Sequence, residues 1–230
     1  MEFQLSGARE KLTKEKTEEL MKPLREKPEN WKKIKLSGKS FDVESAQVVA
    51  EIIPSLVNLE VADLSDIIAG RGEEEAHLAL KLICSSFREL KVKEIDLSEN
   101  ALGKKGVQVC ETLLSKTESV EGVSLNNDGL DQEAAKTLLS FLLPPSSSPS
   151  SSSPLKKLHL FNNLLKDGGA EAISLLLSSS PKMQDFRFSS TRIEKEGITF
   201  LSSSLSSSTS SLTSLDLSDN SISPKGFSLL

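Results

Sequence analysis

One short pattern recurs along this chain, and its spacing restricts the possible folds more than any other feature. A line such as "IDLSENAL" runs to a leucine, continues into a polar turn that contains asparagine, and then leads into a helical stretch. We call the last apolar residue before the turn the marker of its line. The markers are Leu36, Leu64, Leu97, Leu125, Leu160, Phe188 and Leu217.

The spacing of the markers and the pattern that follows them predict a repeat architecture. Successive markers lie 28 or 29 residues apart, except that five residues are inserted after the second line and seven after the fourth. This is the long end of the leucine-rich-repeat period. Apolar residues ten, thirteen and seventeen places after a marker, such as Val107, Cys110 and Leu114, share one helical face, which only stacking can bury. We predict an α/β leucine-rich-repeat horseshoe of the ribonuclease-inhibitor type, with a parallel sheet on the concave face and helices on the convex face.

Three segments fall outside the repeat. Residues 1–30 contain a mixed-charge helical stretch, which predicts an N-terminal helical cap ahead of about seven repeats over residues 31–230. Residues 144–154 are serine and proline only, cannot bury apolar surface, and are predicted to form a disordered loop. The sequence stops at Leu230, one turn into the seventh helix, so apolar residues such as Phe227 lack a cap. We therefore expect the sequence to be a piece of a longer chain.

The composition excludes several classes of function. The chain has no tyrosine and one tryptophan, so stacking platforms for single-stranded nucleic acid are not expected. Its formal net charge of -5 argues against binding to a phosphate backbone and favours a basic partner. We find neither a membrane-length apolar run nor an N-terminal secretory signal. Cys84 and Cys110 match no metal-ligand spacing, so we expect two buried thiols in a reducing, cytosolic compartment.

The sequence offers no self-contained catalytic or metal site. The stretch "SGKS" at residues 37–40 looks like part of a phosphate-binding loop, but the glycine that such a loop needs five residues before Gly38 is Lys33. His77 and His159 lie far apart in the repeat and match neither metal-ligand nor catalytic-triad spacing. We therefore expect no metal, no cofactor and no reaction carried by this chain alone.

Polar residues follow each marker and should line up along the edge where strands lead into helices, which we call the strand-to-helix edge. Asparagines at the turn position, Asn100, Asn163 and Asn220, are expected to be buried and to satisfy backbone groups of the next turn. Asn127 precedes the turn position and is expected to face outward. On this edge and the concave face we predict the following partner-binding residues: Asp66, Glu99, Asn126, Asp128, His159, Asn162 and Arg192.

The second repeat carries an insertion that the core does not require. The stretch "DIIAGRGEEEA" places a Gly-Arg-Gly loop ahead of three acids. Two explanations of Arg71 stand side by side. In the first, it forms a local ion pair with Glu73 or Glu75, acids that also suit the first turn of a helix. In the second, it contacts a partner protein.

Four stretches, in this order and spacing, resemble the leucine-rich-repeat domain of RanGAP, the GTPase-activating protein of the small GTPase Ran. They are "DLSDIIAGRGEEEA", "LSENALGKKG", "LNNDGL" and "DFRFSSTRIEKEG". The resemblance extends from about Phe3 to the last residue and is closest to plant-type members, although the serine-proline tract departs from the family pattern. In the family, the arginine of the inserted loop is needed for activation and a particular asparagine is functionally important. These positions fall on Arg71 and Asn127.

The resemblance implies a regulator of a GTPase that has no active site of its own. Its expected partner is a Ran-type small GTPase in the GTP form, which itself binds the GTP and magnesium. The activator holds the GTPase's own glutamine so that it orients the attacking water, and no arginine finger is used. Asn127 would do the positioning, and Arg71 would fix the docking geometry.

The resemblance also implies a cellular setting, and one alternative stays open. We expect a monomer that acts in nucleocytoplasmic transport from the cytoplasm, either free or at the nuclear envelope, and that binds no nucleic acid and does not insert into membranes. The alternative is a non-catalytic leucine-rich-repeat scaffold that binds some other protein. Such a scaffold would have no reason to keep both Arg71 and Asn127.

Overall fold

A parallel sheet runs through the whole protein, as the repeat predicts. The computed structural model describes residues 1–143, 152–207, 211–222 and 228; Phe227 and Leu230, named above as an uncapped chain end, lie outside these ranges. Eight strands pair in parallel in the order β1-β3-β5-β6-β7-β8-β9-β10, so each repeat adds one strand beside the previous one. From the first repeat onward, each strand ends one residue before its marker. The strands are β1 (Glu2–Gln4), β3 (Lys33–Lys35), β5 (Val61–Asp63), β6 (Glu94–Asp96), β7 (Gly122–Ser124), β8 (Lys157–His159), β9 (Asp185–Arg187) and β10 (Ser214–Asp216).

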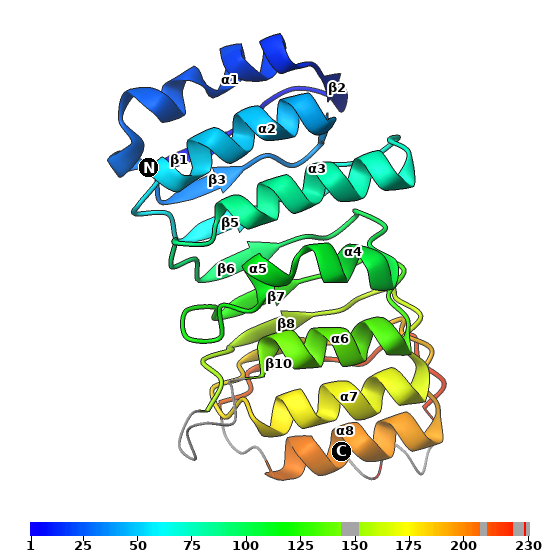
Figure 1. Ribbon diagram of the computed structural model, residues 1–230. Coiled ribbons are helices and arrows are strands. Elements are labelled where there is room, and N and C mark those ends of the chain that lie inside the picture. Colours follow the sequence, from blue (N-terminus) through cyan, green and yellow to red (C-terminus); the bar gives the residue numbers. More distant parts are fainter. Residues whose placement is uncertain (144–151, 208–210, 223–227, 229–230) are drawn as a thin grey trace.

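The helices stack in a row on one face of this sheet (Figure 1). Their apolar faces point inward, and Val107, Leu138 and Ile173 are fully buried. Each such side chain contributes about 1.5–3 kcal/mol when removed from water, so the predicted horseshoe is confirmed together with the force that stacks it. None of the described helices is long and apolar enough to span a membrane. The helices are α1 (Lys14–Glu26), α2 (Val43–Ile52), α3 (Glu73–Ser86), α4 (Gly103–Val109), α5 (Glu111–Leu114), α6 (Gln132–Leu142), α7 (Lys166–Ser178) and α8 (Lys195–Ser207), with short 3-10 turns at Pro28–Asn30 and Ile53–Ser55.

A ladder of asparagines, buried at Asn100 and Asn163 and half-buried at Asn220, ties neighbouring repeats together. Asn100 Nδ2 donates to the carbonyl of its own marker Leu97 (2.7 Å) and to that of Leu64 in the preceding repeat (2.9 Å). Asn163 and Asn220 make the equivalent pairs of hydrogen bonds. The structural role predicted for these three asparagines is confirmed, and the polar turns after the markers are held rigidly in register.

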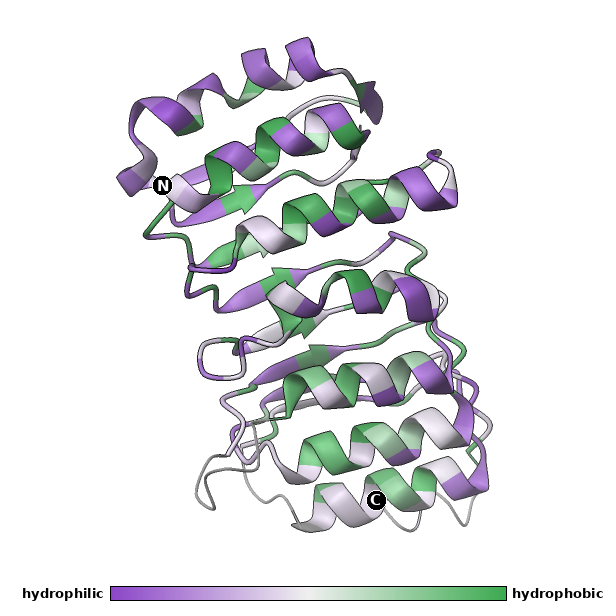
Figure 2. Ribbon diagram, viewed as in Figure 1, coloured by the Kyte–Doolittle hydropathy of each residue, from purple (hydrophilic) through white to green (hydrophobic). Residues whose placement is uncertain are grey.

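The N-terminal segment is more than the helical cap predicted for residues 1–30. Strand β1 extends the sheet by pairing with β3, and a second strand, β2 (Glu10–Leu12), pairs with β4 (Lys39–Phe41) at the strand-to-helix edge. Helix α1 buries Met21 and Leu24 against the first repeat, while the helix is otherwise mostly hydrophilic (Figure 2). Strand β1 satisfies backbone groups of β3, and β2 satisfies those of β4 in a separate two-stranded sheet, which a helix alone would leave unpaired.

The prediction of a disordered loop over residues 144–154 is wrong at its C-terminal end. Residues 144–151 of this tract lie outside the described part of the chain. Ser153, however, is buried: its N–H donates to the carbonyl of Ser179 (2.9 Å), and its Oγ accepts the N–H of Leu155 (3.3 Å). The following repeat therefore starts within the serine-proline tract, because these backbone bonds outweigh a composition that favours disorder.

Candidate functional site

The strand-to-helix edge carries one row of residues with an unusual backbone conformation. The residue two places after each marker has a positive φ, for example 54° at Asn127. This left-handed conformation costs most residues about 1–2 kcal/mol, and glycine, asparagine and aspartate tolerate it best. It turns these side chains out of the sheet at regular intervals. We call these residues, together with Gly7 at the equivalent place after strand β1, the edge row: Gly7, Gly38, Asp66, Glu99, Asn127, Asn162, Ser190 and Asp219.

Asn127 lies in the middle of the edge row and is held by its neighbours on both sides. Its Nδ2 donates to Glu99 Oε1, and its Oδ1 accepts a hydrogen bond from Asn162 Nδ2. Its backbone N–H donates to the carbonyl of Phe161 (3.0 Å). A carboxamide has two donor hydrogens and two acceptor lone pairs, so one of each remains for a partner. Asn127 therefore faces outward, as predicted, in a fixed orientation.

Two exposed apolar side chains lie in the next turn along the edge, whose backbone pairs with Asn127 and Leu130, and the sequence does not single them out. Phe161 is 40% exposed and Leu164 is 41% exposed. Phe161 directly follows its marker, at a position that is serine or asparagine in the other repeats, which is the sequence signal that could have identified it. Polar groups beside exposed apolar side chains are typical of protein-binding surfaces. We call Glu99, Asn127, Phe161, Asn162 and Leu164 the central edge patch.

Five of the other predicted partner-binding residues lie on the same edge. One of them, Asp66, is half-buried and accepts hydrogen bonds from Arg9. Glu99 and Asn162 are exposed. The amide of Asn126 is used internally, because its Oδ1 accepts the N–H of Phe161 (2.9 Å). Arg192 is exposed farther along the edge, where with Lys166 and Glu194 it lines a hollow of about 400 Å³. The structure thus brings Glu99 and Asn162 next to Asn127 and leaves Arg192 apart.

The prediction that Asp128 binds a partner is wrong. Its side chain is fully buried at the turn position that Asn100 and Asn163 occupy in adjacent repeats. One carboxyl oxygen accepts the N–H of Asn100 (2.8 Å), and the other makes no hydrogen bond within the described residues. Burial raises the pKa of Asp128 well above its usual range, although the N–H groups of Asn100 and Leu102 oppose this. Asp128 is a structural residue of the ladder.

The prediction for His159 is also not supported by its placement. The side chain is only 11% exposed on β8, and its Nε2 lies 2.7 Å from Asp185 Oδ2 on β9. Burial lowers the pKa of His159 despite the opposing effect of the Asp185 carboxylate. The pair bridges two strands, so His159 is occupied within the sheet.

Arg71 is turned inward from its loop and is only 11% exposed. Its Nε donates to Ser40 Oγ (3.1 Å), and its Nη2 donates to the carbonyls of Ser40 (2.8 Å) and Leu12 (3.3 Å). Its Nη1 lies 3.6 Å from the Asp42 carboxylate and 3.9 Å from that of Glu75. Of the two explanations of Arg71, the local ion pair is therefore present, with Glu75 and also with Asp42, and the guanidinium is occupied within the chain.

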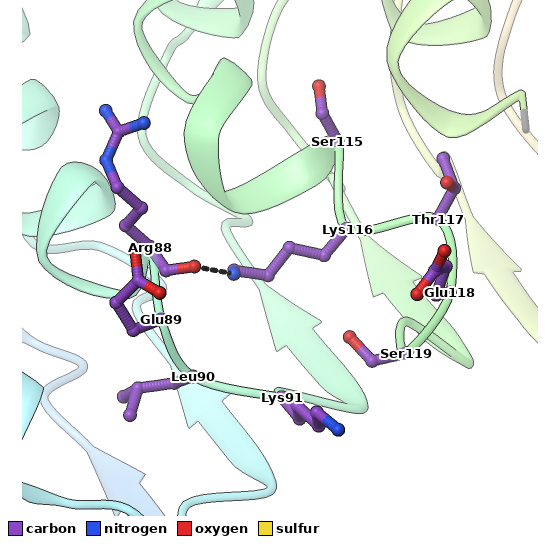
Figure 3. Close-up of a pocket in the computed structure, with 9 residues that line it drawn as sticks. All are labelled: Arg88, Glu89, Leu90, Lys91, Ser115, Lys116, Thr117, Glu118 and Ser119. Atoms are coloured by element: carbon purple, nitrogen blue, oxygen red, sulfur yellow. Dashed lines mark hydrogen bonds between the residues drawn. The ribbon is translucent and has the colours of Figure 1, made fainter. Parts of the chain in front are cut away.

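The opposite edge, where helices lead back into strands, carries a surface hollow. The hollow, of about 440 Å³, lies between residues 88–91 and 115–119 (Figure 3). Lys116 reaches across it and donates to the carbonyl of Arg88 (2.5 Å), and burial lowers the pKa of this lysine. Lys116 thus links its own repeat to the end of the preceding one through the Arg88 carbonyl. The hollow lies at the opposite edge from the central edge patch.

The described residues contain no cluster of three or more histidine, cysteine, aspartate or glutamate side chains that could hold a metal ion. Cys84 and Cys110 are free, buried and 3.7 Å apart between their sulfur atoms. Contact with the Cys84 thiol, together with burial, raises the pKa of Cys110 well above its usual range. Both cysteines are thus unreactive thiols inside the core.

Comparison with known proteins gives three kinds of match: a family model, a solved structure and curated relatives. The family model described as "Leucine Rich repeat" matches residues 151–174 and 209–230. The solved structure of a TLR13–ssRNA13 complex aligns with 87% of this chain and 24% of that chain, at 16% identity and a TM-score of 0.48.

Three curated relatives share a name. RAN GTPase-activating protein 1 of Arabidopsis thaliana is 35% identical over 54% of this chain, and RAN GTPase-activating protein 2 of the same plant is 39% identical over 50%. Ran GTPase-activating protein 1 of Xenopus laevis is 28% identical over 70% of this chain. The matches span 23%, 21% and 29% of the length of these relatives, respectively.

Proposed function

We propose that this chain, a RanGAP-like leucine-rich-repeat protein, stimulates GTP hydrolysis by a Ran-type small GTPase in its GTP form. The names of the relatives suggest the partner. The observation that carries the proposal is the Asn127 carboxamide, which is held at the strand-to-helix edge between Glu99 and Asn162. The GTP and magnesium belong to the GTPase, and this chain acts as a monomeric regulator without a cofactor.

The mechanism that suits this geometry is catalysis by positioning. The GTPase docks on the central edge patch, with Phe161 and Leu164 supplying apolar contact area around the amide. The remaining donor and acceptor of Asn127 bind the GTPase's own glutamine and hold it so that it orients the attacking water. Removing the freedom of a nucleophile and its orienting group lowers the activation barrier without new covalent chemistry. The neighbouring hydrogen bonds keep Asn127 in one rotamer before the GTPase arrives.

The placement of Arg71 favours a mechanism without an arginine finger. A finger must reach a nucleotide site on another protein, whereas this guanidinium is bound to Ser40, Leu12 and Asp42 of its own chain. Releasing it would leave the carbonyls of Ser40 and Leu12 without this donor and the partly buried Asp42 carboxylate without this positive charge, which is costly. Arg71 therefore contributes to activation indirectly, by fixing the loop beside the docking surface.

The same proposal places the protein in nucleocytoplasmic transport. As an activator of a Ran-type GTPase, this chain would act on the cytoplasmic side and stimulate the GTPase to hydrolyse its bound GTP. The net charge of -5 and the exposed acid Glu99 on the edge row suit a docking surface on the partner that is basic opposite this patch. We propose a cytoplasmic protein, with attachment at the nuclear envelope as the alternative.

Single-turnover hydrolysis tests this proposal. A Ran-type GTPase loaded with GTP is mixed with increasing amounts of the chain, and the maximal rate and the half-saturating concentration are fitted separately. Asn127→Ala should lower the maximal rate by about 100-fold, the cost typical of losing one positioning contact at a reacting centre, while the half-saturating concentration changes little. Asn58→Ala, which removes an exposed amide at the opposite edge, serves as the matched control.

Two results would reject the proposal. If the parent chain does not accelerate hydrolysis, the non-catalytic scaffold becomes the better hypothesis. If the parent is active and Asn127→Ala retains the full maximal rate, activation is real but the positioning role of Asn127 is wrong. Asn58→Ala should behave as the parent in both measurements.

A further inference from the structure

A second arginine, Arg9, is presented at the strand-to-helix edge. Its side chain is 64% exposed, in contrast to the 11% of Arg71. Its Nε and Nη2 both donate to Asp66 Oδ2, at 2.9 and 2.6 Å, and Asp66 belongs to the edge row. The carboxylate thus holds one side of the guanidinium, and Nη1 makes no hydrogen bond or ion pair with the described residues. Arg9 is both oriented and accessible.

The loop that carries Arg9 is anchored by a buried charge. Lys39, which is 3% exposed, occupies the turn position that asparagine holds in other repeats. Its Nζ donates to the carbonyl of Ala8 (2.7 Å), next to Arg9, and lies 3.5 Å from the Glu10 carboxylate. Burying a lysine is costly unless its ammonium is satisfied. This chain therefore uses a buried lysine to fix the two residues on either side of Arg9.

Arg9 lies within reach of a protein docked over Asn127. The Asp66 N–H donates to the carbonyl of Ser98, and the Glu99 N–H donates to that of Asn126, so these turns are neighbours in the row. Neighbouring strands lie about 4.8 Å apart, which puts Asp66 about 10 Å from Asn127 along the edge. A small GTPase that covers the central edge patch would also cover Arg9.

We propose that Arg9 is a docking residue of this surface and binds a carboxylate on the GTPase. This inference rests on the proposed function and identifies a partner contact within it. A guanidinium is a flat fork of donors that matches a carboxylate, and Asp66 already fixes its orientation. Arg9 thereby fills the role that the sequence suggested for Arg71, whose nitrogens are occupied internally.

A purely structural explanation of the Arg9–Asp66 pair makes a different prediction. Exposed ion pairs typically contribute only about 0–1 kcal/mol to folding. If the pair served only stability, removing Arg9 would change neither docking nor its salt dependence. If Arg9 binds the partner, its loss should weaken docking and leave the folded state nearly unchanged.

The experiment titrates Arg9→Ala, Arg9→Lys and Arg9→Glu against the GTP-loaded GTPase. Single-turnover hydrolysis gives the maximal rate and half-saturation, and calorimetry with a non-hydrolysable GTP analogue on the GTPase gives direct binding. Arg9→Ala should raise the half-saturating and dissociation constants about tenfold, with the maximal rate kept. Arg9→Lys should recover part of the loss, and Arg9→Glu should deepen it. Arg88→Ala, which removes an exposed arginine at the opposite edge, should match the parent.

Other outcomes overturn the inference. Unchanged binding by Arg9→Ala, with an active parent, rejects Arg9 as a docking residue and leaves the proposed function standing. A lower maximal rate at unchanged half-saturation would place Arg9 in the reaction itself and also rejects docking. If the parent binds the GTPase without accelerating hydrolysis, the proposed function fails, and the calorimetric arm still decides whether Arg9 docks. If the parent does not bind, both fail.

Discussion

At the turn position three residues after each marker, asparagine and aspartate differ in one side-chain atom, a nitrogen that donates hydrogen bonds or an oxygen that does not. This difference decides whether the neighbouring backbone carbonyls receive hydrogen bonds. Asn100 and Asn163 each donate from Nδ2 to two backbone carbonyls. Asp128 stands between them in the ladder and has an oxygen in place of that nitrogen, and this oxygen lacks a hydrogen bond among the described residues. By the repeat geometry it faces the carbonyls of Leu97 and Leu125. A protonated carboxyl group can donate there, whereas a carboxylate cannot.

Asp128→Asn should therefore stabilise the protein at neutral pH. The amide supplies the two missing donors, so we expect a gain of about 1–3 kcal/mol, the cost of a buried polar group without a partner. Chemical denaturation of the variant and the parent at pH 7 measures the difference. Asp219→Asn, at an exposed edge-row position, should change the free energy of unfolding little. Equal stability of parent and Asp128→Asn would show that Asp128 is already satisfied.

The pH dependence of stability should identify the same residue. The pKa of Asp128 is raised in the folded state, so folding favours its protonated form. The stability that this provides is complete below the ordinary carboxyl pKa of about 3.9 and is lost as pH rises toward the folded pKa. Asp128→Asn should lack this loss, so its advantage over the parent should grow as pH rises from about 4. An advantage independent of pH would contradict the assignment. Asp96 and Glu99, which contribute to the shift, are present in both proteins.

At the scale of elements, the N-terminal strand and the Gly-Arg-Gly loop hold each other in place. Lys11 Nζ donates to the carbonyl of Gly70 (2.6 Å), and Arg71 donates to the carbonyl of Leu12. Arg71 also reaches Asp42, the N-cap of α2. The inserted loop therefore joins three elements: β2, β4 and the start of α2.

Arg71→Ala should destabilise this corner of the protein. Hydrogen bonds to charged groups contribute about 1.5–3 kcal/mol each, and their losses overlap here because they share one side chain. We expect a decrease of about 2 kcal/mol in the free energy of unfolding, measured by chemical denaturation. Arg25→Ala, at an exposed position of α1, is the matched control and should stay within about 0.5 kcal/mol of the parent.

The same variant separates a structural role of Arg71 from a partner contact. If Arg71 acts through its loop, Arg71→Lys should recover little stability, because a single ammonium cannot reach Ser40, Leu12 and Asp42 at once. A parent-like stability of Arg71→Ala combined with weaker GTPase binding would instead show that the arginine leaves its internal contacts to meet the partner.

The sequence predicts the repeat and its ladder well, because both depend on local spacing. The markers and the buried asparagines recur at fixed offsets, so their burial and hydrogen bonds can be inferred position by position. The inward turn of Arg71 could not be inferred, since its acceptors lie 31 and 59 residues away in sequence. The same holds for Arg9, whose partner Asp66 is 57 residues away. Contacts between the N-terminal segment and the insertion arise only once the repeats are stacked.

In the candidate site, too, features that depend on local spacing can be predicted from the sequence, whereas contacts between distant residues cannot. Asn127 was identified because its position in the line differs from that of the ladder asparagines, and its outward orientation follows from that offset. The prediction for Asp128 is wrong because acids are usually exposed, whereas the ladder position three residues after the marker buries this one. His159 was misassigned because its partner Asp185 lies on the next strand, and strand pairing brings together residues that are far apart in sequence.

At the scale of the whole molecule, the protein is a linear array in which each unit packs only on its neighbours. Helix α2 packs between α1 and α3, and α7 packs between α6 and α8. In such an array, stability is close to the sum of unit stabilities and the interfaces between neighbours, so an end unit can open without the rest. The N-terminal unit, which carries Arg9, is one such end.

The same leucine-to-alanine substitution should therefore destabilise different lengths of the array in an end repeat and in a central repeat. Leu24 in α1 and Leu138 in α6 are both fully buried, and truncating a core leucine to alanine costs about 2–5 kcal/mol. In Leu24→Ala, only one interface is weakened, so hydrogen exchange should speed up in residues 2–41 while the amides of β7 to β9 keep their protection. In Leu138→Ala, interfaces on both sides are weakened, so protection should fall in the central repeats and the melting temperature should drop more.

If Leu24→Ala reduces protection equally along the whole sheet, the array unfolds as one cooperative unit. The N-terminal unit would then be stabilised by all repeats, and the Arg9 loop would be as rigid as the central edge patch.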